Sequence, residues 1–261
     1  MAWIAVNQDQ RILGVAFARD ALAIGPDITY QEISDDRATD IMHGRVNLQH
    51  AVAAPPPPAV PANTARESHW SRSYPAMMSE RDVDALINLA GLLPDHAVCV
   101  EAGSRLGGST KIFLDNAVGI KRFYSFEPEW ANSVDFAIND PYMAELAQHW
   151  GVGDYKNCYE YAKVLLGAYP NVRLMAMDSP YAVQSWWTEQ LDLFFEDSMH
   201  TNPQMRDSLD FWVPLVRSGG IVAGHDYSPS WPDVVSEADA LAQQFGVALQ
   251  RQGTVWWLIK P

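Results

Sequence analysis

The chain has 261 residues, 48% hydrophobic and 19% charged, which is enough apolar material for one medium-sized domain and a smaller second part. It carries 18 basic and 32 acidic residues, a formal net charge of −14. This acidity argues against a broad phosphate-contacting surface for nucleic acid and against binding to anionic membranes. It favours a protein that acts on a small molecule or gathers divalent cations.

Targeting signals are not evident in the sequence. The first residues show no basic segment followed by an apolar one, and no run of about 18 apolar residues occurs, so neither a signal peptide nor a membrane span is indicated. The two cysteines, Cys99 and Cys158, are expected to be unpaired thiols in a reducing compartment. We therefore expect a cytoplasmic location.

Residues 1–50 predict a small β-rich appendage, with short strands at 3–5, 12–15 and 30–33 and a short helix at 36–46. No catalytic pattern occurs there, so we expect this segment to dock on the main domain, on a partner or on a second copy. It is followed by APPPPAVP at 54–61, and consecutive prolines favour an extended chain over a helix or a central strand. We predict a linker over 51–74.

From residue 75 to 261 the hydrophobic pattern alternates between helices and strands. The predicted helices are 79–91, 109–118, 142–150, 159–169, 180–189, 203–217 and 232–245. The predicted strands are 97–102, 122–126, 172–177, 191–195 and 221–224, followed by a hairpin of 247–250 and 255–259. Such alternation predicts a doubly wound α/β domain whose sheet is mostly parallel, with ligands beyond the carboxyl ends of its strands.

The loop after the first predicted strand is rich in glycine. It reads EAGSRLGGST from Glu101 to Thr110, and glycines permit a tight turn and a close approach of the backbone to a ligand. Ser109 or Thr110 could cap the helix that follows. The position between a strand and a helix favours a ligand site, although a tight turn without a ligand remains the alternative.

Two acidic residues follow the second and third predicted strands. Glu127 lies 20 residues after Gly107, a spacing suited to a carboxylate that accepts both hydroxyls of a ribose. A solvated strand end is the alternative for Glu127. Asp178 could meet an adenine amino group or cap a helix that begins at Pro180, and the sequence leaves both possibilities open.

The fourth and fifth predicted strands end in EDSMH and GHDY, which should bring Asp197, His200, His225 and Asp226 together. Carboxylates with an imidazole suit Mg²⁺ or Mn²⁺ with open water positions. Such a cation could hold two oxygens of a diol and lower the pKa of a hydroxyl, with His200 as a general base. Alternatively, His225 and Asp226 only cap strand ends and His200 is a surface residue.

Taken together, VCVEAGSRLGGST, FYSFEPE, LDLFFEDSMH and SGGIVAGHDY resemble the class I S-adenosylmethionine-dependent methyltransferases. Within them the set is similar to the metal-dependent macrocin-type and other sugar O-methyltransferases. The resemblance covers about residues 95–261. It implies a Rossmann-like sheet of seven strands in the order 3-2-1-4-5-7-6, with the last strand antiparallel.

The resemblance also implies roles for single residues. The cofactor S-adenosylmethionine would be bound by Glu101, Gly103, Ser104, Gly107, Ser109, Glu127, Asp178 and Ser179. Among these, Glu127 would hold the ribose hydroxyls and Asp178 with Ser179 would flank adenine. Asp197, His225 and Asp226 would be metal ligands, and His200 with Asp197 would be catalytic. His225 stands where metal-dependent relatives often have a carboxylate.

We therefore expect an O-methyltransferase that acts on a hydroxyl of a sugar or natural product, assisted by a divalent metal. One alternative is a methyltransferase-fold module that serves only as a scaffold, and a nicotinamide-binding oxidoreductase is disfavoured because the loop lacks G-x-G-x-x-G spacing. Aromatic side chains that could line an acceptor pocket, or instead pack in the core, are Trp70, Tyr74, Trp186, Trp187, Trp212 and Trp231. Trp231, soon after His225 and Asp226, is the strongest candidate for acceptor contact.

Overall fold

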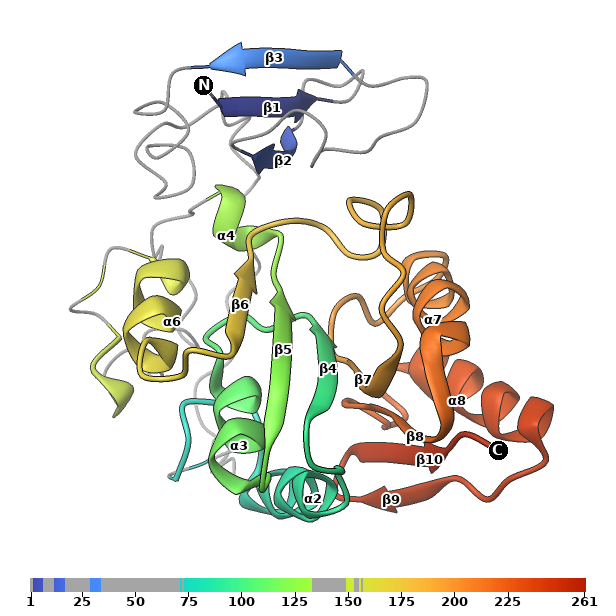
Figure 1. Cartoon of the computed structure of the whole chain (residues 1–261). Coiled ribbons are helices and arrows are strands. Elements are labelled where there is room, and N and C mark those ends of the chain that lie inside the picture. The colour runs from blue at the N-terminus through green and yellow to red at the C-terminus, as the bar shows by residue number, and fades with distance from the viewer. Residues whose placement is uncertain are drawn as a thin grey trace, which may run out of the picture.

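The computed structural model describes the backbone of residues 2–6, 12–16 and 29–33, and then residues 71, 73–132, 149–152, 155 and 157–261. A seven-stranded sheet with helices on both faces makes up the larger part (Figure 1). Its strands are β4 (Ala97–Ala102), β5 (Ile120–Phe126), β6 (Val172–Met175), β7 (Leu191–Glu196), β8 (Val216–Gly224), β9 (Gln250–Gln252) and β10 (Val255–Ile259).

The order of the strands is β6-β5-β4-β7-β8-β10-β9. The five strands from β6 to β8 are parallel to one another, and β10 is antiparallel to both β8 and β9. In the numbering of the domain's own strands this is 3-2-1-4-5-7-6, which confirms the predicted fold class and the antiparallel last strand.

The helices of the described part are α2 (Glu80–Gly91), α3 (Gly108–Asn116), α4 (Glu129–Asn132), α6 (Cys158–Leu166), α7 (Gln204–Leu215) and α8 (Pro232–Phe245). Local chemistry fixes their starts. Ser79 and Asp82 form a capping box at the start of α2, and Pro232 occupies the first turn of α8, where its missing N–H costs nothing. None of the helices in these described segments is long and apolar enough to cross a membrane.

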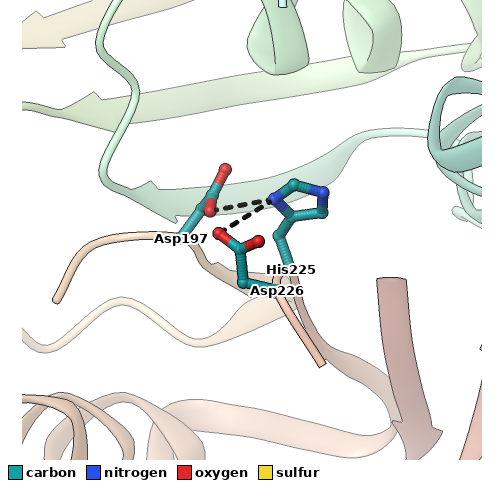
Figure 2. A group of neighbouring side chains, drawn as sticks. All are labelled: Asp197, His225 and Asp226. Carbon is teal, nitrogen blue, oxygen red and sulfur yellow. Dashed lines mark ion pairs between the residues drawn. The ribbon is translucent and has the colours of Figure 1, made fainter. Parts of the chain in front are cut away.

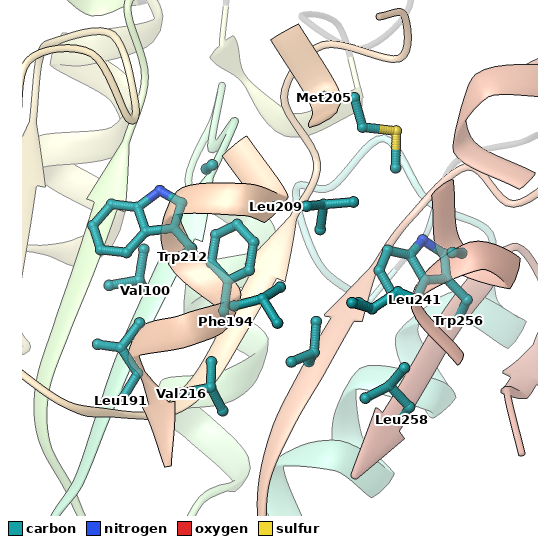
Figure 3. Packing of buried hydrophobic residues seen from close by; sticks show 14 of the residues in the cluster. Val100, Leu191, Phe194, Met205, Leu209, Trp212, Val216, Leu241, Trp256 and Leu258 are labelled. Carbon is teal, nitrogen blue, oxygen red and sulfur yellow. The ribbon is translucent and has the colours of Figure 1, made fainter. Parts of the chain in front are cut away.

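Strand β4 is buried along its whole length, and its side chains alternate between two cores. Val98, Val100 and Ala102 face one cluster, which α7 and α8 cover, while Ala97 and Cys99 face another, which α2 and α3 cover. Figure 3 shows the first cluster. Because both faces of this central strand are apolar, helices pack against both sides of the sheet. The loops at its carboxyl edge therefore follow strands that are buried in the core.

Some predicted elements differ from the structure. The segment 180–189 forms turns over 180–186 and no regular structure over 187–189, rather than a helix. Trp187 packs into the core there, and its indole N–H donates to the Glu189 carbonyl at 2.9 Å. The first strand of the final hairpin is Gln250–Gln252, later than the predicted 247–250. The helix predicted over 203–217 ends at Leu215, where β8 begins.

A separate antiparallel sheet of three strands lies near the N-terminus, in the order β2-β1-β3. The strands are β1 (Ala2–Val6), β2 (Ile12–Ala16) and β3 (Thr29–Ile33), close to the predicted positions. The predicted helix at 36–46 and most of the 51–74 linker lie outside the described residues, as does most of the predicted helix at 142–150. The boundaries 1–50, 51–74 and 75–261 therefore stay predictions.

Candidate active site

A cavity of about 450 Å³ opens at the carboxyl edge of the sheet. This is the position where doubly wound sheets bind ligands. Among the predicted site residues, the cavity is lined by Gly103, Ser104, Ser109, Glu127, Asp178, Ser179, Asp197, His200, His225 and Asp226. The fold thus brings these residues together from the segments that follow five strands, β4 to β8. Glu101 and Gly107 are the two predicted cofactor residues that do not line it.

The glycine loop packs directly against the loop that follows β7. Gly103 has a φ of +87°, and a Cβ atom there would lie 2.0 Å from the carbonyl oxygen of Asp197. Only glycine tolerates both the backbone conformation and the contact. Gly103 therefore sets the distance between the predicted cofactor loop and the predicted metal ligand. Gly107, with a φ of +81°, precedes the first turn of α3.

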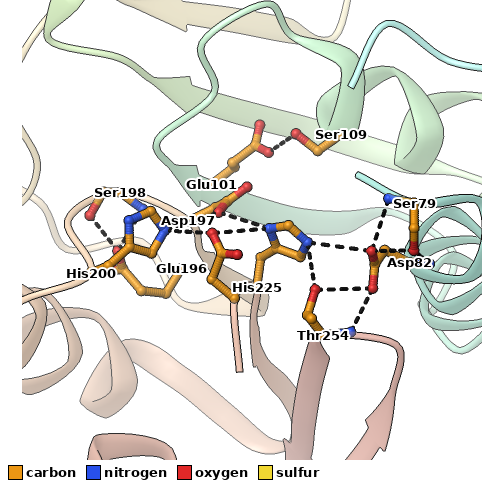
Figure 4. Close-up of polar contacts among 11 residues, drawn as sticks. Ser79, Asp82, Glu101, Ser109, Glu196, Asp197, Ser198, His200, His225 and Thr254 are labelled. Atoms are coloured by element: carbon orange, nitrogen blue, oxygen red, sulfur yellow. Dashed lines mark hydrogen bonds and ion pairs between the residues drawn. The ribbon is translucent and has the colours of Figure 1, made fainter. Parts of the chain in front are cut away.

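Glu101 lies beneath this loop, fully buried, and the Ser125 hydroxyl of β5 donates to its carboxylate at 3.4 Å. Three further hydroxyls donate to the same carboxylate. These come from Ser104, at 2.9 Å, and from Ser109 and Thr110 (Figure 4 shows the Ser109 contact). Burial raises the pKa of Glu101 to about 7, although the three hydroxyls act in the opposite direction. The position of Glu101 suits a residue that shapes the loop from below.

The raised pKa of Glu101 predicts a pH dependence of folding stability. Its folded pKa of about 7 exceeds the ordinary 4.5, so the folded state holds the proton more tightly. The stabilisation is complete below about pH 4.5 and is lost as the pH rises through 7. Glu101→Gln should therefore raise the free energy of unfolding at pH 8 by on the order of 2 kcal/mol relative to wild type, and change it little at pH 5.

Urea unfolding of both proteins at pH 5 and pH 8 measures this difference. Asp84→Asn offers a matched control, because it makes the same acid-to-amide change at an exposed position on α2. An equal effect of Glu101→Gln at the two pH values would contradict the raised pKa.

Glu127 directly follows β5 and is almost completely buried in the cavity wall. Its carboxylate oxygens accept from the backbone N–H groups of Arg105, at 2.8 Å, and Glu129, at 2.9 Å. Burial raises the pKa of Glu127 to about 7, and the nearby charge of Glu129 adds to this. Each oxygen keeps a second acceptor position, so two further hydrogen bonds from a ligand are possible.

Asp178 and Ser179 line the cavity beyond the end of β6. The hydroxyl of Ser179 accepts a hydrogen bond of 2.7 Å from the indole N–H of Trp212, which fixes its orientation. Burial raises the pKa of Asp178. Because no helix begins at Pro180, helix capping by Asp178 is wrong as an explanation of this residue.

Asp197, His225 and Asp226 form a compact cluster whose ligand atoms all lie within 4.8 Å of one another (Figure 2). The Nδ1 atom of His225 lies 3.4 Å from Asp197 Oδ1 and 3.5 Å from Asp226 Oδ2. Burial would lower the pKa of His225, but the two carboxylates raise it well above its ordinary value. His200 and His225 in turn hold the pKa of Asp226 low against the effect of burial. The cluster therefore places two carboxylates beside the Nδ1 atom of His225.

His200 belongs to the same cluster. Its Nε2 atom lies 2.9 Å from Asp226 Oδ2 and 3.8 Å from Asp197 Oδ1, and its ring stacks on Trp231 with centroids 4.6 Å apart. Burial would lower the pKa of His200, yet hydrogen bonding and charge from the two carboxylates raise it to about 9. In the metal-free protein the ring is therefore protonated at pH 7, so its predicted role as a base depends on the charge of its neighbours.

Of the aromatic residues predicted as candidates for an acceptor pocket, some line the cavity and others do not. Trp187 and Trp212 are core residues, and Trp186 and Tyr74 do not line the cavity. Trp231 does line it, as predicted, and Trp70 lies outside the described residues. The cavity wall also includes exposed Met77 and Met199, two residues to which the sequence analysis gave no such role.

Two buried neighbours of His225 were also missed. Asp82, from the start of α2, and Thr254, from the tip of the final hairpin, both contact its Nε2 side (Figure 4). In the sequence Asp82 is visible only as part of a helix start, and Thr254 only as part of a turn. No local pattern marks them, because they meet His225 only through the tertiary fold.

Residues 100–227 match a family model described as a methyltransferase domain. The matched segment runs from β4 to the loop after β8 and contains the residues predicted to bind the cofactor, to bind the metal and to act in catalysis, but not Trp231. No match was found among the curated proteins. Over this segment, which contains five of the seven strands of the sheet, the chain is similar to methyltransferase domains.

Solved structures with a similar fold include methyltransferases of several kinds. A precorrin-6y C5,15-methyltransferase from Geobacter metallireducens is 11% identical, over 75% of this chain and 91% of that one, with a TM-score of 0.46. The N-methyltransferase NodS from Bradyrhizobium japonicum, in complex with S-adenosyl-L-homocysteine, is 14% identical, over 69% and 86%, with a TM-score of 0.43. An rRNA methylase from Streptococcus thermophilus is 14% identical, over 68% and 94%, also with a TM-score of 0.43.

Proposed function

We propose that the protein is an O-methyltransferase that transfers a methyl group from S-adenosylmethionine to a hydroxyl of a small molecule, such as a sugar or natural product, with the help of a divalent cation. The observation that carries the proposal is one cavity that contains both the glycine loop with Glu127 and the Asp197–His225–Asp226 cluster. A donor site and a hydroxyl-activating site are thereby adjacent, as methyl transfer between two substrates requires.

The donor half of the cavity fits an adenosine-containing molecule. S-adenosylmethionine, when bound, supplies a methyl group on a positively charged sulfur. The free acceptor positions of Glu127 would take the two ribose hydroxyls, and Asp178 with Ser179 would flank adenine. Gly103 and Ser104 would contact the methionine part, since both line the cavity next to Asp197.

The acceptor half fits a hard divalent cation. Two carboxylates and one imidazole, with ligand atoms within 4.8 Å of one another, suit Mg²⁺ or Mn²⁺ with positions left for other ligands. A cation held by Asp197, His225 and Asp226 would supply positive charge that lowers the pKa of an acceptor hydroxyl. The residues present therefore fit such a group.

His200 would hold the proton that leaves the acceptor hydroxyl. Its raised pKa depends on the negative charge of Asp197 and Asp226, so whatever neutralises these carboxylates also favours the neutral imidazole that can accept a proton. Trp231 stacks on the outer face of the His200 ring and would offer an apolar surface to a sugar or ring. Acceptor orientation would then be set by Trp231 and deprotonation by His200.

Calorimetric titration with S-adenosylhomocysteine, with and without Mg²⁺, tests the donor half. We expect micromolar binding by the wild type and a loss of about tenfold or more in Glu127→Ala, because two hydrogen bonds to a charged group disappear. Glu189→Ala is the matched control, since Glu189 lies before β7 and pairs with Arg122 and Tyr124 away from the cavity. Absence of binding in the wild type under both conditions would overturn the enzyme assignment and favour the scaffold alternative.

A further inference from the structure

The buried side of His225, away from the cavity, has its own polar contacts. While Nδ1 faces Asp197 and Asp226, Nε2 lies 3.0 Å from the hydroxyl of Thr254 and 3.7 Å from Asp82 Oδ2 (Figure 4). The ring is 7% exposed, so it cannot exchange these partners for water. Its orientation is therefore decided by the residues on its two sides.

The carboxylate of Asp82 divides its two oxygens between two tasks. Oδ2 accepts from the backbone N–H of Ser79, at 2.9 Å, and from the Ser79 hydroxyl, at 2.5 Å, which completes the cap of α2. Oδ1 accepts from the backbone N–H of Thr254, at 2.6 Å, and from its hydroxyl, at 3.2 Å. The cap needs only Oδ2, so the contact of Oδ1 with Thr254 requires a separate explanation.

These contacts fix the direction of the hydrogen bonds. A carboxylate only accepts, so the hydroxyl hydrogen of Thr254 points to Asp82 and a lone pair of the same oxygen is left for His225. The partner of that lone pair must be a donor, which places a hydrogen on Nε2 of His225. In the neutral form of the ring, the form that a cation can bind, the free lone pair is then on Nδ1, the nitrogen that faces the two carboxylates of the cavity.

The tip of the final hairpin is shaped for this contact. Gly253 has a φ of +63°, and a Cβ atom there would lie 2.1 Å from Asp82 Oδ1, so no larger residue allows the approach. The carbonyl of Thr254 accepts from the backbone N–H of Tyr227 at 2.9 Å. Thr254 therefore contacts the 225–227 segment twice, with its hydroxyl at His225 and with its carbonyl at Tyr227.

We propose that Asp82 and Thr254 are positioning residues for His225, which keep the proton on Nε2 and present Nδ1 as the nitrogen that binds the divalent cation. The metal-binding part rests on the proposed function, whereas the orientation of the ring does not. Both residues lie outside the segment 100–227 that matches the methyltransferase domain model. Outer partners of this kind change metal affinity by about 10- to 100-fold when they are removed.

Three single substitutions separate positioning from folding. Thr254→Val removes the hydroxyl with little change of shape, Thr254→Ser keeps the hydroxyl, and Ser79→Ala weakens the cap on Asp82 without touching His225. Mn²⁺ affinity, measured by electron paramagnetic resonance, should fall about 10-fold or more in Thr254→Val. It should stay within about threefold of wild type in Thr254→Ser and Ser79→Ala.

A second measurement needs no metal. Nitrogen-15 NMR of the metal-free protein should show a protected Nε2–H of His225 in the wild type, in Thr254→Ser and in Ser79→Ala, and its loss or marked shift in Thr254→Val. If the wild type binds no Mn²⁺, the metal assignment of the proposed function fails, and the NMR comparison alone decides the positioning role. An unchanged Nε2–H signal in Thr254→Val would overturn the inference.

Discussion

Asp197→Ala should lower the rate of methyl transfer by about 100- to 10,000-fold, the range typical of losing proton-transfer assistance at a reacting hydroxyl. Asp197 lies between the two histidines, 3.4 Å from Nδ1 of His225 and 3.8 Å from Nε2 of His200. Its removal takes one of three ligands from the proposed cation site and one of two carboxylates from His200. Mn²⁺ binding should therefore weaken together with the rate.

The donor half of the cavity should be spared by this change. The affinity for S-adenosylhomocysteine should stay within about threefold of wild type, because Glu127 and Asp178 lie on other loops. Transfer of a radiolabelled methyl group to a panel of sugars and vicinal diols identifies an acceptor and gives the rate. Asp95→Ala is the control, since the Asp95 side chain is 70% exposed and lies before β4, at the opposite edge of the sheet. A wild-type rate in Asp197→Ala would refute the catalytic assignment.

Much of the fold could be predicted because the signals are local. The run AVCVEA has the length and apolarity of a strand buried on both faces, and β4 has exactly its predicted bounds of 97–102. The capping pattern at Ser79 similarly fixed the start of α2. The helix predicted over 180–189 is wrong for the opposite reason, because its conformation is not decided locally. Trp187 of this segment packs against residues that are distant in the sequence, and such packing leaves no local pattern.

In the candidate site, too, some features could be predicted from the sequence and others depend on tertiary packing. The proximity of Asp197 and Asp226 could be predicted from the sequence, because the ends of parallel strands meet at one edge of a sheet. The structure has β7 and β8 as neighbours. The position of Glu101 could not be foreseen in this way. A residue at the end of a strand points to one face or the other, and only the packing of the hydroxyls of Ser109 and Thr110 shows that its carboxylate is enclosed.

Trp212→Phe should lower the free energy of unfolding by about 1–3 kcal/mol more than Trp256→Phe does. Both indoles are fully buried in the same core, so both substitutions remove a similar volume. They differ in one interaction. The Trp212 N–H donates to the Ser179 hydroxyl at 2.7 Å, whereas the Trp256 N–H has no hydrogen-bond partner among the described residues. The difference between the two variants therefore measures how much one buried hydrogen bond, from Trp212 to Ser179 in the cavity wall, contributes to the free energy of unfolding.

Urea unfolding of the two single variants, of Ser179→Ala and of the double variant Trp212→Phe/Ser179→Ala gives a double-mutant cycle. We expect a coupling of about 1 kcal/mol between Trp212 and Ser179, and none between Trp256 and Ser179 in a second cycle that adds the double variant Trp256→Phe/Ser179→Ala. Equal losses in Trp212→Phe and Trp256→Phe would show that volume alone determines their effect. A measured coupling would instead mean that Trp212 orients Ser179. The packing of α7 against the sheet would then determine the position of a side chain in the proposed adenine pocket.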